Sequence, residues 1–216
     1  MSEEVKTFEG LGLSEASLAA IGKKGFESPT PIQRMAIPVL LGETCDVIGQ
    51  AQTGTGKTAA FGLPILESID VSLAMPQALV LAPTRELALQ VADELTSLRG
   101  DGALQVLTVY GGQSISEQLR RLSRGAHIVV GTPGRVLDVI KRGRLPLDQA
   151  KWAVLDEADE MLNMGFIEDV EEILSHVTGG HRTLLFSATM PDRIVKLAKR
   201  FMRDPKLLEV DKDQKP

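Results

Sequence analysis

The chain has 216 residues, of which 43% are hydrophobic and 25% charged, so it can bury the core of one α/β domain or at most two small ones, and global disorder is excluded. Its one cysteine, Cys45, excludes an internal disulfide and a four-thiolate zinc site, and its short apolar runs exclude a bilayer-spanning segment. The net charge of −5 argues against a nucleic-acid-binding protein, because such proteins are more often basic.

The charge is unevenly distributed along the chain. Residues 119–144 contain seven basic residues and one acid, whereas residues 156–176 contain eight acids and no Lys or Arg. An anionic ligand could use the basic stretch, although charge alone favours two solvated helix faces of opposite sign. The acidic start, MSEEVKTFEG, has no apolar stretch, so we expect no secretory signal, no membrane partner and a reducing, cytoplasmic setting.

Short β-branched runs alternate with amphipathic segments along the chain. In chain order we expect helices at 14–23 and 31–41, strand 46–49, helix 57–67, strand 78–82, helix 84–98, strand 106–110, helix 114–123, strand 127–131, helix 133–142, strand 152–156, helix 167–177, strand 183–187, helix 192–201 and strand 206–210. Helix starts are marked by Thr30-Pro31, Thr132-Pro133 and Ser114 with Glu117. The alternation predicts a parallel sheet with helices on both faces and ligands at the carboxyl ends of its strands.

A glycine-rich segment, AQTGTGKT at residues 51–58, follows the first expected strand and precedes a helix. Gly54 and Gly56 allow backbone N–H groups to wrap a phosphate, Lys57 would reach the outer phosphates, and the Thr58 hydroxyl would hold Mg²⁺. The general pattern has Gly where this chain has Ala51. The alternative is a Gly/Thr-rich turn with a surface lysine. The strand before the segment and the helix after it argue against that alternative.

Acidic residues follow the apolar strand run at 152–155 directly. An acid at the end of a buried strand needs a cation, so Asp156 is expected to hold Mg²⁺. Glu157 would orient and deprotonate the attacking water, and Asp159, about one turn later, could contact another polar motif. The alternative is an acidic first helical turn, which accounts for Glu157 and Glu160 but poorly for Asp156.

Taken together and in this order, the motifs resemble those of the N-terminal RecA-like domain of DEAD-box RNA helicases, over nearly the whole chain. The leading Ala51 is normal in that family. The matching segments are GFESPTPIQ at 25–33 (the Q motif, with Phe8 as the upstream aromatic), AQTGTGKT at 51–58, PTRELA at 83–88, Gly111-Gly112, TPGR at 132–135, DEAD at 156–159 and SAT at 187–189. The resemblance implies the RecA-like, P-loop NTPase fold.

The resemblance implies that this chain binds ATP or ADP with Mg²⁺. Gln33 would read the adenine edge, although three residues after Thr30 it could also complete a capping box. Phe26 would pack against the base, although alone it would more often be core. The implied cofactor-binding residues are Phe8, Phe26, Gln33, Gln52, Thr53, Gly54, Thr55, Gly56, Lys57 and Thr58; the catalytic residues are Lys57, Asp156 and Glu157; the metal ligands are Thr58 and Asp156.

The resemblance also implies RNA binding and a coupling contact. The RNA-binding residues would be Pro83, Thr84, Arg85, Gly112, Thr132, Pro133, Gly134 and Arg135. They would contact phosphate and sugar, so recognition would be largely sequence-independent and salt-sensitive. The alternative is ordinary helix caps with solvated arginines. Ser187 and Thr189 would couple the RNA and nucleotide sites by hydrogen bonds to Asp156 or Asp159, or they could cap the following helix.

Residues 1–210 are therefore expected to form an N-terminal RecA-like ATP-binding domain, with the Q-motif segment at about 6–34. Residues 211–216 are read as the start of a linker to a second RecA-like domain, for which this chain has no candidate motif. We expect RNA-stimulated ATP hydrolysis and duplex unwinding to need that second domain. The competing functions are a DNA-directed helicase or translocase on the same fold, and a non-catalytic nucleotide-sensing module.

Overall fold

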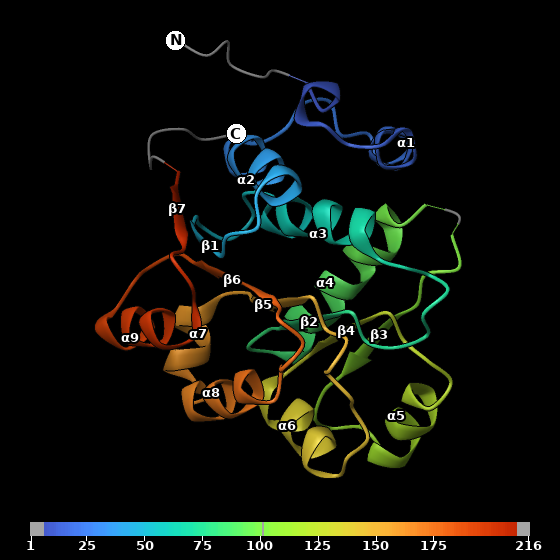
Figure 1. Cartoon of the computed structure of the whole chain (residues 1–216), viewed down its shortest axis with the longest axis vertical. Coiled ribbons are helices and arrows are strands. Elements are labelled where there is room, and N and C mark those ends of the chain that lie inside the picture. Colours follow the sequence, from blue (N-terminus) through green and yellow to red (C-terminus); the bar gives the residue numbers. More distant parts are fainter. Residues whose placement is uncertain (1–6, 101, 211–216) are drawn as a thin grey trace.

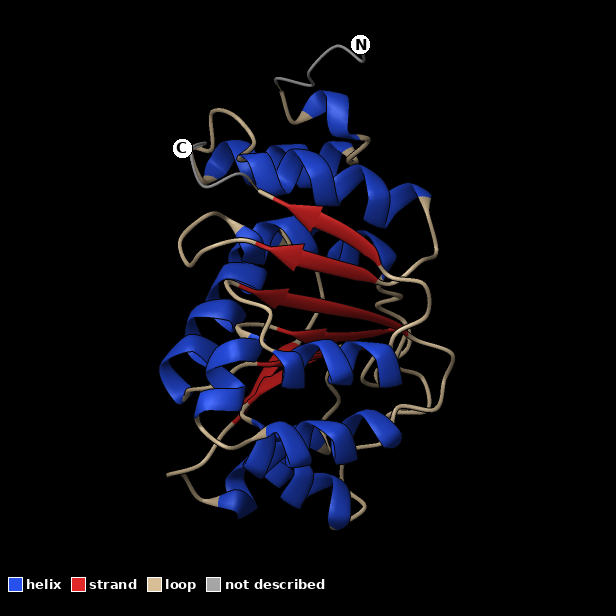
Figure 2. Cartoon of the chain, turned by 90° about the vertical axis from the view of Figure 1, so that its left-hand side faces the viewer, coloured by secondary structure: helices blue, strands red, loops and turns tan. Residues whose placement is uncertain are grey.

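Seven parallel strands run through the centre of the computed structural model, which describes residues 7–100 and 102–210 (Figures 1 and 2). The strands lie in the order β3-β4-β2-β5-β6-β1-β7, and every neighbouring pair is parallel. They are β1 (Val47–Gln50), β2 (Ala78–Leu81), β3 (Val106–Val109), β4 (Ile128–Gly131), β5 (Trp152–Leu155), β6 (Arg182–Ser187) and β7 (Lys206–Glu209). Each expected strand is present within one residue at either end, which confirms the α/β parallel-sheet prediction.

The eight expected helices are also present, and two short ones are additional. The helices are η1 (Glu9–Leu11), α1 (Glu15–Lys23), α2 (Pro31–Gly42), α3 (Lys57–Ser68), α4 (Arg85–Leu98), α5 (Ile115–Leu122), α6 (Pro133–Lys141), α7 (Ala158–Asn163), α8 (Ile167–Ser175) and α9 (Asp192–Phe201). The sequence interpretation missed η1 and α7, because three and six residues are too few to show a helical period. Ser114 and Thr132 stand at the N-caps of α5 and α6, as expected, although neither hydroxyl makes a capping hydrogen bond.

Alternate strand residues face opposite layers of helices. Val47 and Val80 pack with α2, α3 and α4, whereas Ile48 and Leu79 pack with α6, α8 and α9 on the other face. The same helices lie above and below the sheet in Figure 1. A third apolar cluster joins Phe8 and Ile21 to α3 and α4, so the amino-terminal segment forms an outer layer on the first face. Within the described part of the chain, no helix is both long and apolar enough to span a membrane.

Buried Asp46 fixes the strand that leads into the glycine-rich loop. Its Oδ1 accepts the N–H of Thr183 at 2.8 Å and its Oδ2 accepts the N–H of Arg203 at 2.6 Å, while its carbonyl accepts the N–H of Lys206 at 2.9 Å. These bonds tie the start of β1 to the starts of β6 and β7. The carboxyl end of β1, and the loop after it, are thereby placed beside the end of β6.

Candidate functional site

The glycine-rich loop at residues 51–56 connects β1 to α3 and needs glycine at two positions. Gly54 and Gly56 have φ of +80° and +86°, which a side chain rarely tolerates. A Cβ on Gly56 would also lie 2.5 Å from Gln33 Nε2 and 3.1 Å from Thr30 Oγ1. The loop is anchored to β6, because the N–H of Ala51 donates to the carbonyl of Ser187 at 3.1 Å. The backbone N–H groups at the start of α3 are left for an anion.

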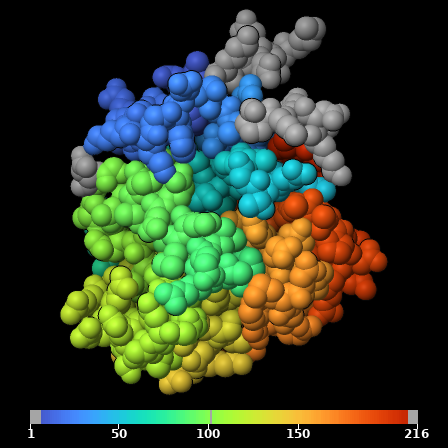
Figure 3. All heavy atoms as spheres, turned by 180° about the vertical axis from the view of Figure 1, so that it is seen from behind, coloured from blue at the N-terminus to red at the C-terminus, as the bar shows by residue number. Residues whose placement is uncertain are grey.

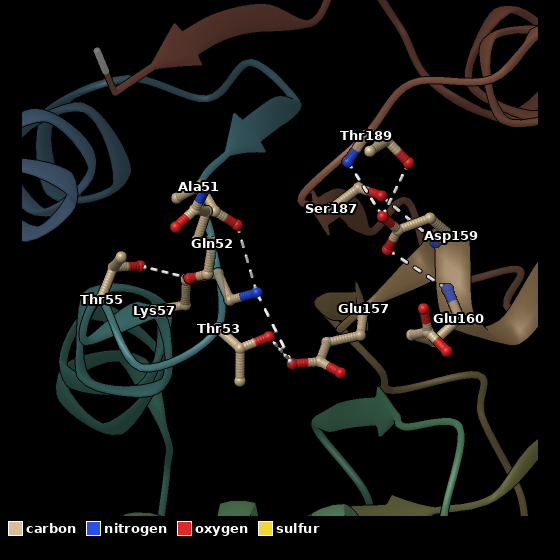
Figure 4. A network of polar contacts seen from close by, with 10 residues as sticks. All are labelled: Ala51, Gln52, Thr53, Thr55, Lys57, Glu157, Asp159, Glu160, Ser187 and Thr189. Carbon is tan, nitrogen blue, oxygen red and sulfur yellow. Dashed lines mark hydrogen bonds and ion pairs between the residues drawn. The ribbon is translucent and has the colours of Figure 1, made fainter. Parts of the chain in front are cut away.

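Lys57 and the acidic segment meet at this loop (Figure 4). The Lys57 side chain is only 5% exposed, and its Nζ lies 3.4 Å from the Ala51 carbonyl and 3.8 Å from Glu157 Oε1. The Thr53 hydroxyl donates to the same Glu157 oxygen at 2.9 Å. Glu157 has a φ of +53°, a left-handed conformation that is costly for a residue with a side chain. The expected approach of the glycine-rich loop to the acids after β5 is therefore present.

Asp156 is almost completely buried at the end of β5, and its Oδ1 has no hydrogen-bond partner. Burial raises the pKa of Asp156 to about 6, against the opposing charge of Lys57. A buried, unpartnered carboxylate oxygen is the kind of atom that a hard cation satisfies. No three His, Cys, Asp or Glu side chains of the described residues are grouped as a metal site, so a cation beside Asp156 and Thr58 would take further ligands from phosphate and water.

A pocket of about 320 Å³ opens beside this loop, which is an ordinary size for a small-molecule site. It is lined by Phe26, Gln33, Thr53, Gly54, Gly56, Lys57, Thr58, Ala59, Leu87, Gln90, Val91, Glu94, Asp156 and Glu157. Most of the residues that the sequence assigned to the nucleotide are therefore brought together. Gln52 and Thr55 belong to the same loop, where the Thr55 hydroxyl donates to the Gln52 carbonyl at 2.7 Å, but they do not line the pocket.

Phe8 is not on the pocket wall. It is 4% exposed and stacks behind Phe26, with ring centroids 6.4 Å apart. The sequence interpretation also missed the contribution of α4, whose residues Leu87, Gln90, Val91 and Glu94 line the pocket. Their spacing marks one face of a helix, but nothing in the sequence indicates which element that face meets.

Gln33 links the start of α2 to the glycine-rich loop. Its Oε1 accepts the N–H of Thr30 at 2.9 Å, and its Nε2 donates to the carbonyl of Gly56 at 3.1 Å. The capping box that the sequence predicts for Thr30 and Gln33 is therefore present at the start of α2. A nucleotide base would have to compete with these two bonds or use the remaining valences of the amide.

Asp159, rather than Asp156, receives the contacts of Ser187 and Thr189 (Figure 4). The Thr189 N–H and hydroxyl donate to Asp159 Oδ2 at 2.9 and 2.8 Å, and the Ser187 hydroxyl accepts the N–H of Asp159 at 3.1 Å. Burial raises the pKa of Asp159, but the hydrogen bonds of Thr189 and Ser187 outweigh it and hold that pKa below its ordinary value. The end of β6 is thus tied to the start of α7.

The loops assigned to RNA lie next to one another at the carboxyl ends of β3, β4 and β2, which are adjacent strands. The Arg85 guanidinium lies 4.9 Å from the Tyr110 ring centre, close to Gly112. Arg135 donates to the Gln113 carbonyl at 3.1 Å, which joins the loop after β4 to the loop after β3. Thr84 caps α4 by accepting the N–H of Leu87 at 3.2 Å. Pro83, Thr132, Pro133 and Gly134 belong to the same loops and helix starts.

The sequence profile of the DEAD/DEAH box helicase family matches residues 30–197. The chain belongs to this family. Over 204 residues it is 57% identical to the DEAD-box ATP-dependent RNA helicase CshA of Geobacillus kaustophilus, covering 94% of this chain and 44% of that protein. It is 55% identical to the ATP-dependent RNA helicase CshA of Listeria monocytogenes, covering 94% of this chain and 39% of that protein.

This DEAD/DEAH box helicase domain also matches solved structures of similar proteins. A crystal structure of a DEAD box protein from the hyperthermophile Methanococcus jannaschii superposes with a TM-score of 0.93 at 50% identity, over 96% of this chain and 57% of that one. The RecA-like fold and the family resemblance expected from the motifs are confirmed. The chain spans less than half the length of the curated relatives named above. The expected linker at 211–216 lies outside the described residues, as does the first residue of the Q-motif segment.

Proposed function

We propose that this chain is the ATP-binding half of an ATP-dependent RNA helicase, which binds ATP or ADP with Mg²⁺ and the sugar-phosphate backbone of single-stranded RNA. The observation that carries the proposal is the meeting of Lys57, Asp156 and Glu157 in one pocket with Gln33 and the glycine-rich loop. A DNA-directed helicase would use the same phosphate chemistry, so it remains the competing function. A non-catalytic module would have no need of a carboxylate at Glu157.

Each residue of the pocket has a role in this proposal. The loop N–H groups and Lys57 would bind the phosphates, and Thr58 and Asp156 would hold Mg²⁺, which supplies neutralisation of phosphate charge when bound. Glu157 would leave Lys57 and Thr53 and accept a proton from the attacking water. Gln33 and Phe26 would bind the adenine. The hydrogen bonds among Asp159, Ser187 and Thr189 would transmit the nucleotide state to the neighbouring strands.

The RNA would lie across the loops after β2, β3 and β4, with Arg85 and Arg135 facing its phosphates. Binding would be largely independent of base sequence and would weaken as salt rises. A second RecA-like domain of the same parent protein would close over both ligands, complete the ATP site and bend one strand, which opens a short duplex. We expect this to take place in the cytoplasm.

Titration of a fluorescent ADP analogue with Mg²⁺ tests the nucleotide site. Lys57→Ala should weaken binding by tenfold or more, of the order expected for losing a charge-assisted hydrogen bond to phosphate. Lys196→Ala is the matched control, because that lysine is exposed on α9, which covers the opposite face of the sheet. Unfolding curves should show both variants to be folded. Unchanged affinity in a folded Lys57→Ala protein would rule out the phosphate assignment.

A further inference from the structure

One face of α4 runs between the two proposed ligand sites. Leu87, Gln90, Val91 and Glu94 follow the i, i+3, i+4, i+7 spacing of a single helix face and line the nucleotide pocket. Arg85, in the first turn of the same helix, belongs to the proposed RNA surface. Part of the pocket wall is therefore a helix whose first turn belongs to the proposed RNA surface.

Lys24 connects this helix to the amino-terminal segment. Its ammonium pairs with the Glu94 carboxylate and donates to the Ser97 hydroxyl at 2.8 Å. The Ser97 hydroxyl in turn donates to the Glu94 carbonyl at 2.7 Å, which keeps it in place. The side chains of Lys24 and Glu94 are 23% and 26% exposed, so solvent screens the pair less than it screens a fully exposed one.

The same ammonium lies 5.4 Å from the centre of the Phe26 ring. Phe26 follows a tight turn: Gly25 has a φ of +74°, and the N–H of Phe26 donates to the carbonyl of Ile21 at 3.3 Å. This turn belongs to no strand or helix; its backbone is bonded to α1, and the Lys24–Glu94 pair is a side-chain contact between the turn and α4. Figure 3 shows the blue amino-terminal segment seated on the green segment that contains α4, where α1 and α4 pack together.

We propose that Lys24 and Glu94 are positioning residues of the nucleotide pocket. Their ion pair holds Phe26 at a fixed distance from α4, and both Phe26 and α4 line the pocket. The base then binds to side chains that are already ordered, so less conformational entropy is lost on binding. The inference rests on the proposed nucleotide function. It adds two residues that are 70 positions apart in the sequence but in contact in the fold.

The test measures the affinity of the chain for ADP and for GDP by competition with a fluorescent ADP analogue. Lys24→Ala and Glu94→Ala should each weaken ADP binding roughly three- to tenfold, the cost of ordering one or two freed side chains. Both should also narrow the preference for ADP over GDP, because the base contacts are lost while the phosphate contacts remain. The charge-swapped variant, with Lys24→Glu and Glu94→Lys together, should recover most of the loss.

Two further variants separate positioning from general damage. Asp93→Ala, the neighbouring exposed acid on α4, should bind like the wild type. Combining Lys24→Ala with Phe26→Ala should cost no more than Phe26→Ala alone, because Lys24 acts through Phe26. Single variants with wild-type affinity and selectivity, additive losses in the double variant, or a charge swap without recovery would each overturn the inference. Failure of the wild type to bind ADP would instead overturn the proposed function, and this inference with it.

Discussion

Two neighbouring residues of the pocket are held in costly states. Asp156 is buried with one carboxylate oxygen unpartnered, and Glu157 keeps a left-handed backbone. Folding alone gains nothing from either state. Both states suit a site for a cation and phosphates, because a bound cation would satisfy the unpartnered oxygen of Asp156. Without ligand, these states should lower the free energy of unfolding of the domain, and the part due to Asp156 should change with pH.

The stability of the nucleotide-free and metal-free domain should depend on pH through Asp156. Burial raises the pKa of Asp156 from 3.8 to about 6, so between these pH values the folded protein holds a proton that the unfolded chain has released. The contribution of this group to stability therefore falls as pH rises through that window and stays unfavourable above it. The difference corresponds to about 3 kcal/mol at most.

Asp156→Asn removes this charge with little change of shape. Denaturant unfolding should find the variant more stable than the wild type at pH 7 and nearly equal to it at pH 4. Asp93→Asn, at an exposed site, should show no such divergence. An Asp156→Asn protein that is no more stable than the wild type at pH 7 would contradict the assigned burial cost.

Most of the pocket residues could be predicted, because the glycine-rich and acidic motifs lie at strand ends and the chemistry of each motif is local. The contact of Lys24 with Glu94 could not, since the two residues are 70 positions apart and each looks like an ordinary surface charge. Phe8 shows that a motif position does not fix a contact. Its place in the motif predicted a contact with the nucleotide, but its ring stacks behind that of Phe26. The sequence pattern therefore predicts which segment lies near the pocket, whereas the packing of the fold determines which of its side chains line it.

At the scale of elements, β1 can lie close to β6 because Gly49 has no side chain. Gly49 of β1 is paired with Phe186 of β6, and a Cβ on Gly49 would lie 2.4 Å from the Phe186 ring. That ring is fully buried and packs against Phe61 of α3, with centroids 5.3 Å apart. The strand that leads into the glycine-rich loop can therefore move little without disturbing α3.

Gly49→Ala should destabilise the domain by about 1–3 kcal/mol, because the ring of Phe186 has no free space into which to move. Gly22→Ala is the contrasting change: its Cβ would meet nothing within 4 Å in helix α1, and it should stabilise by about 0.5–1 kcal/mol. Chemical denaturation of the two variants against the wild type measures both effects. Equal stability of the two proteins would contradict this account of the β1–β6 contact.

The positions of the elements along the chain could be predicted closely. Of their arrangement, the sequence predicted a parallel sheet with helices on both faces but not the order of the strands. β-branched runs end where glycine, proline or acids begin, which is why each strand was placed within a residue. The order of the strands depends on contacts between distant segments, such as the bonds from Asp46 to Thr183 and Arg203. Helix α7 was not predicted because its six residues, of which the first two belong to the acidic motif, are too few to show an apolar period.

At the scale of the whole molecule, net charge is a poor guide to ligands. The chain carries −5 overall, yet the loops proposed for RNA present Arg85 and Arg135 at helix starts, where backbone N–H groups add to their field. Much of the acidic excess lies on other elements: Glu168 and Glu171 of α8 pair with Arg193 and Arg200 of α9. Local placement of donors therefore decides which anion is bound.

The chain spans 44% of the Geobacillus relative, so we expect it to bind nucleotide without turning it over efficiently. In other nucleotide hydrolases an arginine finger that completes the site contributes about 10³–10⁵ in rate, and we expect the second RecA-like domain to complete the ATP site here. Steady-state ATPase assays with single-stranded RNA should show little or no stimulation. Adding a separately made second RecA-like domain should restore stimulation by RNA and not by DNA. Robust RNA-dependent turnover by the chain alone would refute this expectation, and equal stimulation by DNA would favour the competing helicase.

The place of β1 in the sheet has a consequence for how the protein is made. This strand leaves the ribosome early, yet its two partners, β6 and β7, are the last strands in sequence order among the described residues. About 160 residues separate Gln50 from the end of β7, which at roughly 5–20 residues per second means a wait of about 10–30 s. Until then the glycine-rich loop has its contact with Gln33 of α2 but lacks its bond to Ser187 of β6, so a nascent chain should not complete the nucleotide site before β6 has been synthesised.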